Sequence, residues 1–168
     1  HHDASGGLES YVSAVEAIVR ETVAVFGELP VFENDTYTFI ADYLTSATGD
    51  AMEHRNSTVL TSSGRLDDPG QRERLLGSVA HEFFHAWNAE RIRPRSLEPF
   101  DFTDANISGE LWLAEGFTNY YGKLVTIRAG LRSLPGMLQE LGATIDTVIA
   151  SPGRQLNSAV EMSRLAPF

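Results

Sequence analysis

The stretch DDPGQRERLLGSVAHEFFHAWN, residues 67–88, determines the fold that we expect for this chain. Asp67 and Asp68 can accept hydrogen bonds from the free amides of a helix start, and proline at position 69 is tolerated in the first helical turn. We therefore expect a helix that runs to about Asn88. Apolar residues cover most of its circumference, which predicts a buried helix at the centre of the fold. They are Leu75, Leu76, Val79, Ala80, Phe83, Phe84 and Trp87.

Two histidines interrupt this apolar helix. His81 and His85 lie four residues apart, so both imidazole rings leave the same face one turn apart and can reach one metal ion. Glu82 lies beside that face, where a carboxylate can take a proton from an attacking water molecule. The alternative is that both histidines are hydrogen-bonded core residues. Burial of two histidines and a carboxylate is unfavourable without a partner, however, and a divalent ion supplies one.

The third ligand of such a site should come from the next helix. A catalytic zinc ion takes three protein ligands and leaves a fourth position open. The chain has no cysteine, so a histidine or carboxylate must serve. Glu115 lies among large apolar residues in LWLAEGFTNYY, residues 111–121, where a carboxylate needs a partner. We therefore expect one Zn²⁺ ion, held by His81, His85 and Glu115.

Composition limits the partners of the chain. Thirteen basic and 23 acidic residues give a formal net charge of −10, which disfavours nucleic acid and anionic membrane surfaces as partners. No apolar run approaches the roughly 20 residues needed to cross a bilayer, and the start of the chain lacks the pattern of a signal peptide. We expect no nucleic-acid partner and no membrane insertion.

The remaining elements follow from hydrophobic periodicity and turn residues. Helical spacing of apolar residues indicates helices, and β-branched and aromatic runs indicate strands. The expected elements are helices over residues 8–26, 112–129 and 133–150 and strands over residues 36–44 and 57–61. Together with the central helix they predict an α+β fold, in which a small, mostly antiparallel sheet packs on a helical bundle.

Three segments together resemble the glycyl aminopeptidase family of zinc metallopeptidases, which is related to thermolysin. They are DAMEHRNST (50–58), HEFFHAWNAERIRP (81–94) and LWLAEGFTNYY (111–121). The resemblance implies a thermolysin-like zincin core, with residues 1–168 forming a single metallopeptidase catalytic domain. Members of the family commonly carry an N-terminal β-domain and a C-terminal PDZ-like domain. Neither fits in this length, so we expect an excised catalytic domain.

The resemblance also implies roles for two further residues. Glu53 would lie on an edge strand beside the cleft, where related enzymes use a glutamate to hold the free amine of the substrate. The alternative is a solvated glutamate paired with His54 or Arg55. Asn119 follows Glu115 by four residues, where relatives often carry an aspartate that orients a ligand histidine. Its side-chain oxygen could accept the same bond, or Asn119 could be a plain helix-surface residue.

The activity implied by the resemblance is a zinc-dependent aminopeptidase, which releases N-terminal glycine or another small residue from peptides with a free N-terminus. Two alternatives stay open: an endopeptidase of the same chemistry, and a zinc-stabilised domain without turnover. Relatives stabilise the oxyanion with a tyrosine or histidine downstream of the glutamate ligand, and we expect that residue beyond Phe168. Tyr120 and Tyr121 are adjacent in a helix, so at most one could face the metal. An incomplete site would leave this chain inactive by itself.

Overall fold

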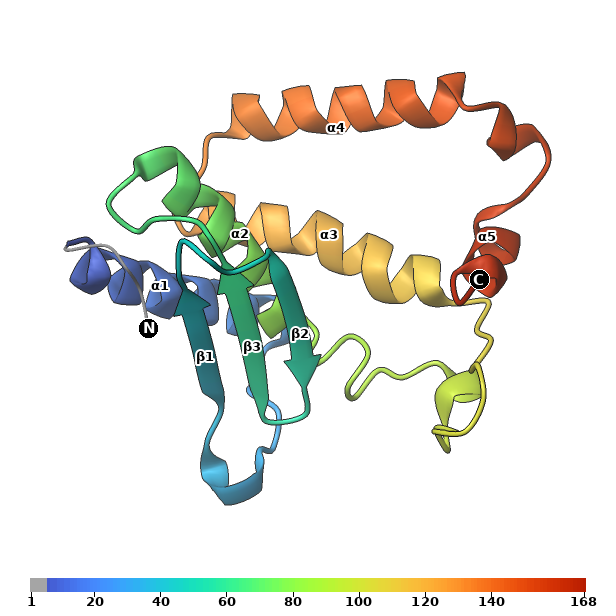
Figure 1. Ribbon diagram of the computed structural model, residues 1–168, viewed down its shortest axis with the longest axis horizontal. Helices are drawn as coiled ribbons and strands as arrows, with labels where there is room; N and C mark the ends of the chain where they lie inside the picture. The colour runs from blue at the N-terminus through green and yellow to red at the C-terminus, as the bar shows by residue number, and fades with distance from the viewer. Residues whose placement is uncertain (1–5) are drawn as a thin grey trace.

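The computed structural model describes residues 6–168, which form an α+β fold with a three-stranded sheet packed beside helices (Figure 1). The expected fold class is confirmed. The helices are α1 (Leu8–Phe26), α2 (Pro69–Phe84), α3 (Leu111–Arg128), α4 (Leu134–Ala150) and α5 (Ala159–Leu165). The strands are β1 (Thr38–Tyr43), β2 (Asp50–His54) and β3 (Ser57–Ser62). No helix among residues 6–168 is long and apolar enough to span a membrane.

The central helix α2 begins where the sequence predicts. Asp68 is its N-cap, and the carboxylate accepts a hydrogen bond of 2.8 Å from the backbone amide of Gln71. Pro69 occupies the first turn, where backbone amides have no carbonyl partner within the helix, so the amide hydrogen that proline lacks is not needed. The apolar residues expected in the core are buried along its length. The helix therefore forms the common wall between α1, α3 and the sheet.

The far end of α2 differs from the prediction. The α-helix ends at Phe84 instead of near Asn88, because the amides of Ala86 and Trp87 bond to carbonyls three residues back instead of four. His85 is thus the C-cap residue of α2. This tightened turn directs the side chain of Asn88 towards α3, where it forms hydrogen bonds.

The sheet is mixed rather than mostly antiparallel, with strand order β1-β3-β2. β2 and β3 form an antiparallel hairpin, whereas β1 pairs with β3 in parallel. The physical reason is that the chain reverses direction after β1 and again after β2, so β3 runs the same way as β1. Because β3 lies in the middle, β2 is left as an edge strand. On β2, Ala51 and Glu53 are half-buried, and the alternate residues face solvent.

α4 and α5 lie at the periphery. α4 lies roughly parallel to α3 but set apart from it, and Met137 is its only buried residue among those described (Figure 1). The sequence pattern does not predict α5, because it is too short to show helical periodicity. Its start is a capping box in which Ser158 and Glu161 satisfy each other's backbone amides. Ser163 of α5 accepts a hydrogen bond of 3.0 Å from the amide of Trp112, which joins α5 to the start of α3.

Candidate metal centre

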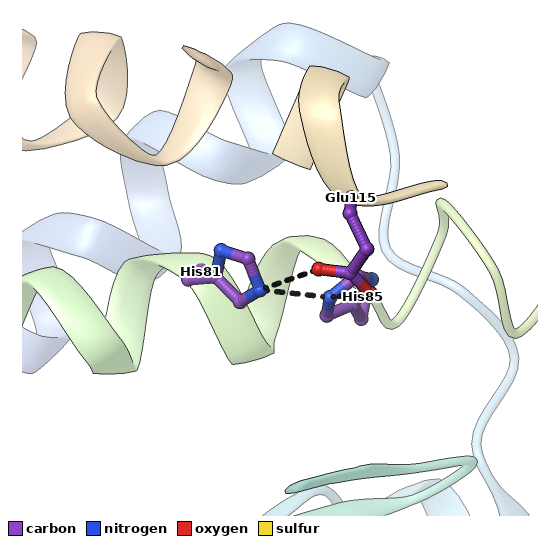
Figure 2. Close-up of side chains that lie close together, drawn as sticks. All are labelled: His81, His85 and Glu115. Carbon is purple, nitrogen blue, oxygen red and sulfur yellow. Dashed lines mark hydrogen bonds and ion pairs between the residues drawn. The ribbon is translucent and has the colours of Figure 1, made fainter. Parts of the chain in front are cut away.

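Three of the predicted site residues meet between α2 and α3 (Figure 2). His81 and His85 come from the last turn and the cap of α2, and Glu115 comes from the first half of α3. The two imidazole Nε2 atoms are 3.0 Å apart. The carboxylate oxygens of Glu115 lie 3.3 Å from His81 Nε2 and 3.6 Å from His85 Nε2. Two imidazole nitrogens and the two oxygens of one carboxylate therefore lie close together.

The spacing of these atoms suits a zinc ion. Zinc binds histidine nitrogen and carboxylate oxygen at about 2.0–2.2 Å, so two ligands of a tetrahedral ion lie roughly 3.3 Å apart. The separations of 3.0, 3.3 and 3.6 Å in the structure bracket that value. Two imidazoles and one carboxylate are a ligand set that zinc takes in catalytic sites, with the fourth position open. The residues present thus fit a zinc ion.

The ring of His85 is fixed from behind by a backbone carbonyl. His85 is 1% exposed, and its Nδ1 lies 2.8 Å from the carbonyl oxygen of Asn88. A carbonyl can only accept, so Nδ1 carries the proton. The lone pair of His85 is therefore on Nε2, the atom that faces Glu115 and His81.

Asn88 and Thr118 are supporting residues that the sequence pattern did not indicate. The side-chain amide of Asn88 donates to the carbonyls of Leu113 and Ala114 at 3.1 and 3.0 Å, and to Thr118 Oγ1 at 3.0 Å. Asn88 thereby joins the end of α2 to the turn of α3 that precedes Glu115. Asn88 stands out in the sequence as a polar residue three positions after His85 in an apolar stretch. A continuous helix to residue 88 would not have pointed its side chain towards α3, so the sequence did not predict these bonds.

Glu82 is buried beside the two histidines, with 6% of its surface exposed. Burial raises the pKa of its carboxyl to about 7; His81 opposes this shift, and the nearby Glu53, Glu115 and Asp50 carboxylates add to it. A carboxyl with a pKa near neutrality can both accept and release a proton under ordinary conditions. This is the property expected of a general base and acid.

Charges in the centre favour an ion pair between His81 and Glu115. The hydrogen bond from His81 holds the pKa of Glu115 below its usual value, although burial acts in the opposite direction. Burial lowers the pKa of His81, but the carboxylates of Glu115, Glu82 and Glu53 outweigh it, so the net pKa is raised. The excess of carboxylate over imidazole gives the centre a negative field that suits a cation.

The edge strand β2 brings Glu53 to the same centre. One of its carboxylate oxygens lies within 4.8 Å of ligand atoms of both Glu82 and His85. No ion pair joins Glu53 to His54 or Arg55 within residues 6–168. Glu53 therefore lies close to the candidate centre, and its role in holding a substrate amine stays a prediction.

A cavity of about 320 Å³ opens between α2 and α3 and reaches the centre. His81, Glu82 and Asn119 line the end nearest the candidate ligands. Lys123 and Arg132 line the other end, where both are paired with Glu140. The cavity therefore reaches His81 and Glu82, whereas Glu53, His85 and Glu115 are not among its lining residues.

Comparison with known proteins agrees with the resemblance seen in the sequence. Residues 74–167 match the family model described as M61 glycyl aminopeptidase. The chain belongs to this family. The matched segment contains the two histidines, Glu82 and Glu115. No curated protein shows a significant match to this glycyl aminopeptidase family member.

The fold is also similar to a solved structure. The crystal structure of an aminopeptidase N family protein from Idiomarina loihiensis matches with a TM-score of 0.84 and 25% sequence identity. The match covers 99% of this chain and 28% of that chain. This chain therefore spans less than a third of the length of that protein.

Asn119 does not make the bond that we expected of it. Its side-chain amide donates to the backbone carbonyl of Glu115, one turn back on the same helix, at 3.0 Å. No hydrogen bond between residues 6 and 168 joins Asn119 to His81 or His85. The i−4 carbonyl lies within reach of the exposed side chain, which therefore bonds along its own helix. In this family member, His85 is held instead by Asn88 and Thr118.

Neither candidate tyrosine donates a hydrogen bond to the centre. Tyr121 stacks on Phe84, with ring centroids 5.3 Å apart, so its ring belongs to the packing between α2 and α3. Tyr120 is 46% exposed and lies edge-on to Tyr121. The expectation that at most one of the two faces the metal is consistent with this arrangement.

We predict that Asn88→Ala weakens zinc binding by about 10–100-fold, as is typical when a residue that orients a ligand is lost. The reason is that the loss frees the turn whose carbonyl fixes His85. Competition with a fluorescent chelator would measure the affinity. Asn119→Ala is the matched control, because within residues 6–168 the side chain of that asparagine bonds to its own helix alone. Equal zinc affinity of the two variants would contradict the role given to Asn88.

Gly122 allows α3 to approach α2 at the position of His81. A Cβ atom at Gly122 would lie 3.3 Å from the amide nitrogen of His81 and 3.4 Å from its Cα. Gly122→Ala should therefore push the helices apart and destabilise the protein by about 1–3 kcal/mol, as overpacking does. Gly116→Ala is the control, since nothing lies within 4 Å of a Cβ there. Thermal unfolding should show a lower midpoint for Gly122→Ala; a midpoint equal to that of the control would refute the close-packing argument.

Proposed function

We propose that residues 1–168 form a single catalytic domain of a zinc-dependent aminopeptidase that releases N-terminal glycine or another small residue from peptides. The observation that carries this proposal is the placement of Glu53 within 4.8 Å of Glu82 and His85, on the edge strand beside the three candidate ligands. A zinc ion held by His81, His85 and Glu115 would supply Lewis-acid polarisation of the peptide carbonyl.

Glu82 performs the proton transfers in this proposal. Its carboxylate accepts a proton from the water molecule that attacks the first peptide carbonyl, and later passes this proton to the amine that leaves. Without a metal ion, burial raises the pKa of this carboxyl to about 7; a bound cation would lower it and so favour the carboxylate form that accepts the proton. Burial also keeps the carboxylate in place beside the histidines.

Glu53 recognises the substrate in this proposal. A carboxylate can hold an ammonium group through charge-assisted hydrogen bonds, and Glu53 lies on the edge strand beside the centre. The exposed outer edge of β2 can in addition pair with an extended peptide through backbone hydrogen bonds. Together, these contacts would leave space for only one residue before the bond that is cut, which is what distinguishes an aminopeptidase from an endopeptidase.

Substrates that differ only at the amine test this proposal. We expect the protein to hydrolyse a glycyl-anilide and to hydrolyse the N-acetylated form far more slowly, because acetylation removes the charge that Glu53 would bind. Measurement of kcat/KM for both compounds decides the question. Equal rates would support an endopeptidase of the same chemistry, and no turnover of either compound by zinc-loaded protein would support a zinc-stabilised domain without catalysis.

A further inference from the structure

Arg91 joins three separate segments around the metal centre. Its guanidinium donates to the backbone carbonyls of Ala86 at 2.6 Å and Val31 at 2.9 Å, and twice to that of Arg55 at 3.3 Å. The same group lies over the ring of Phe32, with 5.1 Å between the guanidinium carbon and the ring centroid. One side chain thus ties the end of α2 to the loop before β1 and to the turn between β2 and β3.

Two of these segments carry functional side chains. Ala86 directly follows His85, and Arg55 lies two residues after Glu53. Because β2 is hydrogen-bonded to a neighbouring strand on one side alone, its distance from α2 depends on contacts at its ends. The bonds from Arg91 to the Ala86 and Arg55 carbonyls provide such a contact, since they link the end of α2 to the turn that follows β2.

The loop after α2 holds Arg91 itself in a defined position. The amides of Arg91 and Ile92 both bond to the carbonyl of Trp87, at 3.0 and 2.7 Å. Ala89 adopts a φ of 106°, a value that a residue with a side chain rarely takes, and its amide bonds to the carbonyl of Ile92. The side chain therefore leaves from a tightly folded loop.

The neighbouring Arg93 makes a different kind of contact. It pairs with Glu98 at 3.1 Å and donates to the carbonyl of Leu97 at 3.3 Å, both within its own loop. Arg91, in contrast, makes no ion pair within residues 6–168. Its guanidinium donates its hydrogen bonds to backbone carbonyls of other segments. A planar guanidinium can serve several acceptors at once, whereas a lysine ammonium is a point charge on a flexible stem.

We propose that Arg91 is a positioning residue that fixes the β2–β3 turn, and through it Glu53, at a set distance from the metal centre. The inference rests on the proposed function in so far as Glu53 binds the substrate amine. Arg91 touches neither the candidate ligands nor the reacting atoms in this scheme. Its loss should therefore impair recognition of the amine without removal of zinc.

Hydrogen exchange tests the positioning role without any assay of activity. In zinc-loaded Arg91→Met, backbone amides of residues 50–57 should exchange about tenfold faster or more, because several bonds from a charged donor are lost. Arg91→Lys should restore the protection only in part. Arg93→Met is the matched control and should leave these amides as protected as in the parent protein. Unchanged exchange in Arg91→Met with zinc fully bound would overturn the proposal.

Kinetics then test whether Arg91 acts through Glu53. In Arg91→Met, KM for the free glycyl-anilide should rise more than kcat falls, and the preference over the N-acetylated substrate should decrease. The double variant Arg91→Met/Glu53→Gln should lose no more preference than Glu53→Gln alone, because both changes remove the same interaction. Additive losses would overturn the proposal. If the parent protein shows no preference, the proposed amine recognition fails, and the exchange measurement still decides the role of Arg91.

Discussion

Glu82→Gln is expected to keep zinc bound while peptidase activity falls by about 10²–10⁴-fold, the usual contribution of a general acid–base. Glutamine has nearly the same shape, so the buried pocket around Glu82 should stay packed. Its amide cannot accept the proton of the attacking water, however, and cannot return one to the leaving amine. Zinc content by mass spectrometry and kcat/KM on a glycyl-anilide would be measured on the same sample.

The control for this variant is Glu16→Gln, which makes the same change at an exposed position of α1. It should retain both zinc and activity. Near-normal hydrolysis by Glu82→Gln would show that the proton is carried by another group. Loss of zinc from Glu82→Gln would show instead that this carboxylate acts as a ligand, a possibility raised by its closeness to Glu53 and His85.

Glu115→Ala is expected to lose zinc. Removal of the third ligand leaves two imidazoles, and zinc sites with open catalytic positions take three protein ligands. The loss of affinity should exceed the roughly 10–100-fold typical of a residue that only supports a ligand. Glu115→Ala should therefore lose more zinc affinity than Asn88→Ala, and the two variants can be compared directly. Isothermal titration with zinc, with Glu16→Ala as control, measures the difference; zinc affinity close to that of the parent protein would rule out Glu115 as a ligand.

The structure brings together the three residues that the sequence singled out, and their role as metal ligands stays a prediction. Two histidines four residues apart on a helix must share a face, whatever the rest of the fold does. Glu115 was singled out because an acid among apolar residues was expected to be buried and to need a partner, but 44% of its side-chain surface is exposed. The α+β class followed from periodicity in the same way, since α1 and α3 repeat their apolar residues at helical spacing.

The supporting contacts could not be predicted because they depend on tertiary geometry. Asn88 reaches α3 only because α2 tightens and ends before it, and helix ends are set by hydrogen-bond choices that a periodic pattern does not encode. Asn119 occupies a position that the family resemblance marks, but in this structure its amide bonds to the carbonyl of Glu115. The parallel pairing of β1 with β3 was missed because strand order, unlike strand content, leaves no mark on a single strand.

The four bonds of Arg91 illustrate the same limit. Its three acceptors are backbone carbonyls at residues 31, 55 and 86, and carbonyl acceptors have no signature in the residue type. The sequence shows only a basic residue in a loop. Its contacts become visible when the turn after β2, the loop before β1 and the end of α2 are in place.

X-ray absorption spectroscopy of the zinc-loaded protein tests the central claim most directly, since it reports the atoms around the ion itself. We predict a first shell at about 2.0–2.2 Å that contains two imidazole nitrogens and carboxylate oxygen. One imidazole should be lost in His81→Ala, and carboxylate oxygen should be lost in Glu115→Ala at zinc concentrations high enough to load its weakened site. A first shell of oxygen atoms alone, unchanged in both variants, would contradict the assignment of His81, His85 and Glu115 as the metal ligands.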